Sequence, residues 1–171
     1  MDAGPIGLYA VQLIRLRGVK TVICLDTDAG ASGWSWPKPG ADYTINVSRE
    51  TLYSGSERSQ RRHGRLRPGL RRAPTVPVTA MNLLKKAGTY AITGLYHTLP
   101  QVDLGKVVRS EIDIYGTICY TRQEFEECLH FIEDGRVKVD PLITHHFPLR
   151  EMEQAFAITQ AKQSIKIILN P

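Results

Sequence analysis

The chain has 171 residues, of which 42% are hydrophobic and 23% are charged, values that suit a soluble globular domain with a sizeable core. No apolar run approaches the roughly 20 residues of a membrane-spanning helix, and no cleavable signal pattern is visible, so we expect a cytoplasmic protein without a membrane partner. The three cysteines are widely spaced, which argues against a disulfide framework and against a zinc knuckle.

The net charge of +5 arises from one stretch of the chain. Residues 57–72 contain seven arginines against a single acid, Glu57, so the remainder is close to neutral. The basic character therefore says little about the partners of the domain as a whole.

The chain opens on a glycine-rich turn that leads directly into an apolar helix, predicted over residues 4–17 and ended by Gly18. In dinucleotide-binding folds such a turn joins a strand to a helix N-terminus, on which the pyrophosphate sits. Here the turn and helix are present and the strand is not. The next strand is predicted over Thr21–Asp26, and Asp26 follows Gly7 by 19 residues, close to the ~20 typical of the acid that binds a ribose.

The middle of the chain lacks regular periodicity. Residues 29–39 are rich in glycine, tryptophan and proline, and a short strand is predicted over Ala41–Val47. Residues 48–77 are polar, arginine-rich and punctuated by prolines, which predicts a long irregular insertion without helix or strand.

Regular structure is predicted again from Val78 onward. Thr121 is expected to cap a helix that ends before Gly135, with Glu124 completing a capping box and Phe125, Leu129 and Ile132 forming an apolar stripe. The other predicted elements are a helix from Val78 to Lys86, a helix over 149–162 with Met152, Ala155, Phe156 and Ile158 facing inward, and strands over Thr89–Leu95, Ile112–Thr117 and Ser164–Leu169.

Several short motifs occur in an order and spacing that point to one family. They are Gly4-Pro5-Ile6-Gly7-Leu8, Val22-Ile23-Cys24-Leu25-Asp26, Gly40-Ala41-Asp42, Gly88-Thr89-Tyr90-Ala91-Ile92-Thr93-Gly94, Gly116-Thr117, Tyr120-Thr121-Arg122, Asp140-Pro141-Leu142-Ile143-Thr144-His145, Phe147-Pro148-Leu149 and Lys166-Ile167-Ile168-Leu169-Asn170-Pro171. With these motifs the chain resembles the C-terminal half of the zinc-containing medium-chain alcohol dehydrogenases, in the branch with polyol, threonine and secondary-alcohol dehydrogenases.

The resemblance implies a Rossmann domain that binds NAD and serves a small alcohol or polyol substrate. Asp26 would bind the adenosine ribose and, by repelling a 2′-phosphate, favour NAD over NADP. Asp2 stands where the first fingerprint glycine would be, which places a negative charge beside the phosphates. The implied cofactor-binding residues are Gly4, Pro5, Ile6, Gly7, Asp26, Thr93, Gly94, Leu95 and Arg122.

The resemblance also implies that the catalytic zinc lies elsewhere. The family's zinc ligands sit mostly in an N-terminal domain, and no equivalent precedes Met1. The adjacent pair His145-His146 points to opposite sides in an extended chain and is interpreted as a loop pair that does not chelate. We therefore predict no catalytic residue and no metal ligand in this chain, NAD binding that is weak or lost, and no activity in isolation.

The two irregular segments stand where the family has its second helix and fourth strand. With permitted codons and a shifted reading frame, residues 33–39 back-translate into a helix ending, and residues 61–73 into a hydrophobic strand. We hypothesise that both are frame-shifted translations, which the coding DNA tests. Loss of the first and fourth strands would split the sheet, because these strands flank the dinucleotide crevice.

The predicted fold class is therefore α/β, a doubly wound Rossmann-like parallel sheet that is incomplete. It forms one partial domain: residues 1–47 carry the first helix and strands, 48–77 the irregular segment, 78–162 the second half, and 163–171 a strand that would join the missing catalytic domain. Two alternatives are a partial gene model of an active dehydrogenase and an arginine-rich nucleic-acid-binding protein. We favour a solvated or mistranslated stretch over a nucleic-acid arm, because no aromatic residue interleaves the arginines. The family also suggests a homo-oligomer paired through strand edges around Ile112–Thr117.

Overall fold

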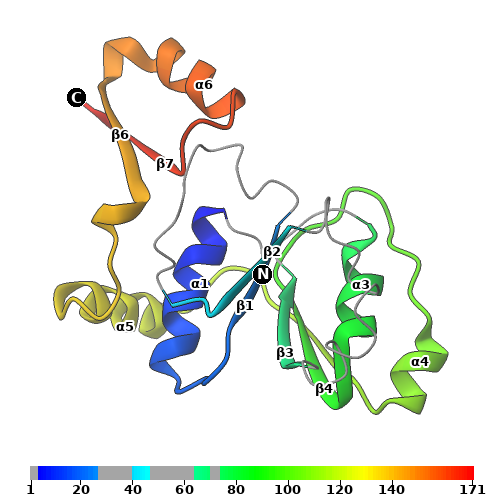
Figure 1. Ribbon diagram of the computed structural model, residues 1–171. Coiled ribbons are helices and arrows are strands. Elements are labelled where there is room, and N and C mark those ends of the chain that lie inside the picture. The colour runs from blue at the N-terminus through cyan, green and yellow to red at the C-terminus, as the bar shows by residue number, and fades with distance from the viewer. Residues whose placement is uncertain (1–3, 27–39, 47–63, 70–73) are drawn as a thin grey trace. The chain divides into compact units, whose positions relative to one another are not determined.

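The computed structural model describes residues 4–26, 40–46, 64–69 and 74–171 (Figure 1). The chain divides into two compact units. Unit 1 comprises residues 1–2 and 49–119, and unit 2 comprises residues 3–48 and 120–171. Each unit contains parallel strands with helices between them.

Unit 2 begins with helix α1 (Pro5–Leu16), followed by the parallel strands β1 (Ile23–Asp26) and β2 (Tyr43–Asn46). Proline in the first turn favours this start, because its missing N–H has no partner to lose there. The helix buries Leu8 and Val11. The predicted helix and both predicted strands are confirmed, with shifts of at most two residues at their ends.

Unit 1 contains a three-stranded parallel sheet in the order β3-β4-β5, built from Gly64–Gly69, Leu84–Ile92 and Asp113–Gly116. Helix α3 (Val76–Leu83) packs on β3 and β4, and the short helix α4 (Leu104–Arg109) precedes β5 (Figure 1). The sheet and α3 enclose an apolar core of Ala80, Met81, Leu84, Tyr90 and Ile112.

The strand orders fit an incomplete Rossmann-like α/β fold, as the sequence predicts. The pair β1-β2 and the trio β3-β4-β5 match positions 2-3 and 4-5-6 of the Rossmann order 3-2-1-4-5-6. Among the described strands, β1 and β2 form a two-stranded sheet separate from β3-β4-β5.

Strand β3 contradicts the sequence prediction. Residues 48–77 were expected to contain no strand, yet Gly64–Gly69 forms β3, which runs parallel to β4. Proline is compatible with a strand whose N–H side has no ladder partner, and within the described sheet β3 is an edge strand. Pro68 therefore does not prevent pairing. The predicted loss of the second helix falls on residues 27–39, outside the described residues.

The C-terminal part of unit 2 contains helix α5 (Arg122–Glu133), the 3-10 turns η1 (Asp140–Leu142) and η2 (Leu149–Glu151), and a third sheet. In that sheet β6 (Ile143–Pro148) and β7 (Lys166–Asn170) are parallel, and helix α6 (Met152–Gln160) packs on both. The interpretation of His145-His146 as a loop pair is wrong, because both lie on β6, opposite Ile167 and Ile168.

Two helices differ from the predicted packing. The predicted capping box of α5 is confirmed, since Thr121 and Glu124 exchange both hydrogen bonds. Its apolar stripe is nevertheless exposed by 43–49% at Phe125, Leu129 and Ile132. On α6 Ala155 is buried as predicted, whereas Met152 and Phe156 are exposed. Helical spacing thus identified the apolar faces of α5 and α6 correctly, but no other described residue buries these faces fully.

Candidate cofactor-binding site

The N-terminus of α1 carries four of the predicted cofactor residues. Gly4 is the N-cap in an extended conformation (φ −71°, ψ 175°), and its carbonyl accepts a hydrogen bond from Leu8 N at 3.0 Å. As a glycine, Gly4 offers no capping side chain, and no acid lies in the first turn of the helix. Gly7 is buried while Ile6 is 69% exposed. The positive end of the helix dipole is therefore chemically suited to a phosphate. Asp2 lies outside the described residues.

Asp26 ends strand β1, and its backbone pairs with that of Asn46 at the end of β2. The carboxyl ends of parallel strands form the edge at which open α/β sheets bind nucleotides. The backbone position of Asp26 therefore agrees with its predicted role.

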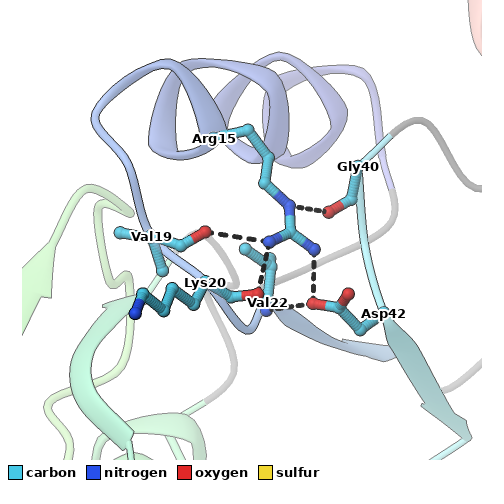
Figure 2. Close-up of polar contacts among 6 residues, drawn as sticks. All are labelled: Arg15, Val19, Lys20, Val22, Gly40 and Asp42. Carbon is cyan, nitrogen blue, oxygen red and sulfur yellow. Dashed lines mark hydrogen bonds and ion pairs between the residues drawn. The ribbon is translucent and has the colours of Figure 1, made fainter.

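The opposite end of α1 is attached by one arginine to the segments that precede β1 and β2 (Figure 2). Arg15 Nε donates to the carbonyl of Gly40 at 2.6 Å, and Nη1 donates to the carbonyls of Val19 at 2.8 Å and Lys20 at 2.6 Å. Nη2 forms an ion pair with the carboxylate of Asp42. The planar guanidinium presents several donors in a fixed geometry, which suits this set of acceptors.

Asp42 completes the attachment by accepting a hydrogen bond from Val22 N at 2.7 Å, next to β1 (Figure 2). The N–H of Val22 and, secondarily, the Arg15 guanidinium outweigh partial desolvation and hold the pKa of Asp42 below its usual value. Sequence reasoning quoted Gly40-Ala41-Asp42 for its resemblance alone and missed Arg15. An arginine in the last helical turn was the available signal, but it does not identify a partner.

Gln12 forms a second polar attachment of α1. Gln12 is 9% exposed, and its side-chain amide pairs with the backbone of Lys138. The amide nitrogen donates to the carbonyl of Lys138 at 3.1 Å, and the amide oxygen accepts from the N–H of Lys138 at 2.7 Å. These two bonds fix the helix to the segment that follows α5. Sequence reasoning also missed Gln12, because polarity alone predicts an exposed residue.

Unit 1 carries three predicted residues, Thr93, Gly94 and Leu95, immediately after β4. At this carboxyl edge β5 continues the pairing, since Thr117 N donates to the carbonyl of Ile92 at 2.9 Å. Leu95 is 60% exposed. The segment therefore begins at a fixed point and exposes an apolar side chain at the strand end.

Arg122, the remaining predicted residue, lies in unit 2 at the start of α5. Its side chain is 92% exposed and Nε pairs with Glu126 Oε1 at 2.8 Å. The nine predicted cofactor residues are thus divided, with six in unit 2 and three in unit 1. The role of these nine residues in cofactor binding stays a prediction.

The described residues include neither a metal-binding cluster nor a membrane-spanning helix. They contain no group of three or more histidine, cysteine, aspartate or glutamate side chains arranged to hold a metal ion. No helix in this part of the chain has the length and apolarity of a membrane span.

The fold is shared with solved dehydrogenase structures. A short-chain alcohol dehydrogenase of Escherichia coli, solved with NADH, superposes with a TM-score of 0.86 at 24% identity, covering 99% of this chain and 50% of that one. Galactitol-1-phosphate dehydrogenase of Escherichia coli gives 0.84 at 23% identity, covering 99% and 51%.

No family model matches the chain, but curated sequences resemble it over nearly its whole length. L-threonine 3-dehydrogenase of Chromobacterium violaceum is 30% identical over 98% of this chain and 49% of its own length. Sorbitol dehydrogenase of Gallus gallus is 28% identical over 98% and 47%. The chain spans about half the length of these relatives. It is thus a homologue of the zinc-dependent alcohol, sorbitol and threonine dehydrogenases, aligned with their C-terminal half, as the sequence motifs predict.

Proposed function

We propose that this chain is the cofactor-binding part of an NAD-dependent dehydrogenase for small alcohols or polyols, and that its 171 residues do not transfer hydride by themselves. The observation that supports it is the glycine-rich N-terminus of α1, with Gly4 extended and Gly7 buried, followed in the chain by a β1 strand that ends in Asp26. The family's names support the alcohol or polyol substrate. We expect a cytoplasmic location, where exposed thiols such as Cys119 and Cys128 persist.

The residues present fit the dinucleotide within each unit. The N–H groups at the start of α1 would hold the pyrophosphate, and Asp26 would bind the adenosine ribose. Thr93, Gly94 and Leu95 would lie beside the nicotinamide, and Arg122 would reach the cofactor only after leaving Glu126. When bound, NAD supplies the hydride acceptor.

Weak or lost binding follows from the strand pairing. In a Rossmann domain the dinucleotide crosses the carboxyl end of the strand that precedes the first helix. Among the described strands β1 pairs with β2 alone, so this pair has no described neighbour that would extend the sheet toward a dinucleotide. The zinc ligands that the family uses to polarise the substrate oxygen lie in the other half of those enzymes, so the described residues offer no route to polarise an alcohol.

The test is a titration with NADH followed by its fluorescence, together with a turnover assay on sorbitol and threonine in the presence of zinc. We expect no saturation below about 1 mM, equivalent to a binding free energy weaker than about −4.1 kcal/mol, and no turnover. Tight saturable binding, or turnover by the 171 residues, would contradict the proposal.

A second candidate is an active enzyme whose other half is encoded by neighbouring sequence. The half-length coverage of both relatives favours it. Genomic sequence that supplies a strand and zinc-ligand motifs in frame would support this candidate, whereas stop codons in that region would argue against it.

The proposal includes self-association and no nucleic-acid partner. Within the described sheet β5 is an edge strand, and Ile114 and Tyr115 on it are 39% and 59% exposed. Such an edge offers backbone groups to a second copy of the chain. Sedimentation of the purified chain tests this, with a monomer at all concentrations contradicting it.

A further inference from the structure

The loop that follows β4 is attached at both ends. At its start, Ile92 is held in the ladder opposite Gly116, and its carbonyl accepts the N–H of Thr117. At its end, the hydroxyl of Tyr96 lies 3.2 Å from the hydroxyl of Tyr90. Three residues, 93–95, lie between these two attachments. Because ordering each residue costs about 1–2 kcal/mol of backbone entropy, a fixed far end restricts this short loop substantially.

Tyr90 is a rigid anchor for this contact. It is 1% exposed and belongs to the apolar core with Met81, Leu84 and Ile112. A buried hydroxyl needs a hydrogen-bond partner, and Tyr96 supplies one from outside the strand. Burial, and after it the Tyr96 hydroxyl, raises the pKa of Tyr90, so the Tyr90 hydroxyl keeps its proton at physiological pH.

We propose that the Tyr90–Tyr96 hydroxyl pair is a latch that holds Thr93, Gly94 and Leu95 in the conformation that receives the nicotinamide end of the dinucleotide. Tyr96 is a positioning residue in this role, since it acts through the loop. The inference rests on the proposed function, because it assigns the loop to the nicotinamide. It adds a residue pair that neither the motifs nor the relatives' names indicate.

The experiment compares two ligands on the full chain. NADH carries the nicotinamide, and ADP-ribose lacks it but retains the rest of the molecule. Ligand-observed NMR measures both affinities into the millimolar range. Tyr96→Phe should weaken NADH binding about two- to tenfold, the range of one hydrogen bond, and change ADP-ribose binding less than twofold. A general loss of structure would weaken both ligands alike.

Three further variants sharpen the result. Tyr90→Phe removes the same bond from its other end, so it should match Tyr96→Phe, and the double variant should be no worse than either single one. Tyr115→Phe removes an exposed hydroxyl from β5 and should leave both affinities unchanged. An additive double variant would contradict a shared bond.

Hydrogen exchange tests the latch independently of any ligand. Amides of residues 93–96 should exchange about two- to tenfold faster in Tyr96→Phe than in the unmodified chain, whereas Tyr115→Phe should not change them. Unchanged exchange overturns the latch. Equal weakening of both ligands, no weakening of NADH, or failure of the unmodified chain to bind either ligand overturns its nicotinamide role. Tight binding or turnover by the unmodified chain instead contradicts the proposed function and leaves the ligand ratio as the measure of the latch.

Discussion

Helix α1 of unit 2 and helix α3 of unit 1 are attached to their strands in different ways. At its C-terminal end, α1 is fixed by Arg15 through four acceptors, among them the carboxylate of Asp42, and Gln12 forms two further bonds to the backbone of Lys138. In unit 1, α3 contributes Ala80 and Met81 to an apolar core with Tyr90.

The contrast between polar attachment and apolar packing predicts which substitutions each helix tolerates. Polar attachments are directional and respond to charge, so they fix an element's position but depend on pH. Apolar packing is non-directional and responds to volume, so it is sensitive to cavities. Substitutions in the two units should therefore fail for different physical reasons.

The largest effect is expected from emptying the unit 1 core. Tyr90→Ala should lower the free energy of unfolding by about 3–5 kcal/mol, because it removes a buried aromatic ring and leaves a cavity. Urea denaturation followed by circular dichroism measures the loss, and hydrogen exchange in residues 84–92 locates it. The control, Tyr115→Ala, changes an exposed ring and should cost much less. Equal losses in the two variants would refute the packing argument.

An intermediate effect is expected where α1 meets the start of β2. Gly40 has φ +88°, and an added Cβ would approach Val11 Cγ1 at 3.0 Å and Arg15 Cγ at 3.2 Å. Gly18 has a similar φ of +80°, but a Cβ added there would have no neighbouring atom within 4 Å. Gly18→Ala should cost about 1–2 kcal/mol through backbone strain alone, and Gly40→Ala should cost about 1 kcal/mol more because the helix is crowded as well. Thermal or urea unfolding of both variants tests this. Equal losses of stability would show that α1 accommodates the added Cβ by shifting at no cost in free energy.

The smallest effect is a change in acid sensitivity. The pKa of Asp42 is lower in the folded chain than in the unfolded one. Its stabilisation is therefore complete above the usual aspartate pKa of about 3.9 and is lost as pH falls through the lower folded-state value. In the unmodified chain the urea midpoint should therefore fall as the pH drops below about 3.9. Asp42→Asn should make this fall less steep.

Glu124 provides the comparison for this experiment. Its pKa is also lowered, chiefly by the N–H of Thr121 in the α5 capping box, so it contributes a decline of the same sign. Glu124→Gln should leave the part of the acid decline that comes from Asp42 unchanged. In that variant, hydrogen exchange in α1 should still become faster when Asp42 is replaced by Asn. An unchanged acid decline in Asp42→Asn would mean that the ion pair does not stabilise α1.

Local signals in the sequence predicted many elements correctly. Proline in the first turn and Gly18 after the last one bounded α1, and the Thr121–Glu124 box began α5. These signals work because each involves backbone groups within a few residues of one another. Two candidate cofactor residues lie at strand ends, with Asp26 ending β1 and Thr93 following β4, and their role in cofactor binding stays a prediction.

Pairing over long distances limited the prediction elsewhere. Strand β3 lies in a segment of arginines and prolines that carries no strand pattern, and β4 begins at Leu84, where a helix was expected to continue. Ala87 adopts φ +54° and its N–H bonds to the carbonyl of Ser110, which a sequence window around residue 87 does not contain. Tertiary partners thus override local propensity.

The sequence by itself indicated the homology to the zinc-dependent dehydrogenases, the α/β class and the boundaries of α1 and α5, because these depend on periodicity, caps and motif order along the chain. The tertiary structure alone decided that Arg15 joins Asp42, that Gln12 pairs with Lys138 and that Tyr96 closes onto Tyr90. The first two contacts join residues far apart in the chain. The third depends on how a loop turns back over its own strand. Side-chain geometry of that kind leaves no periodic trace in the sequence.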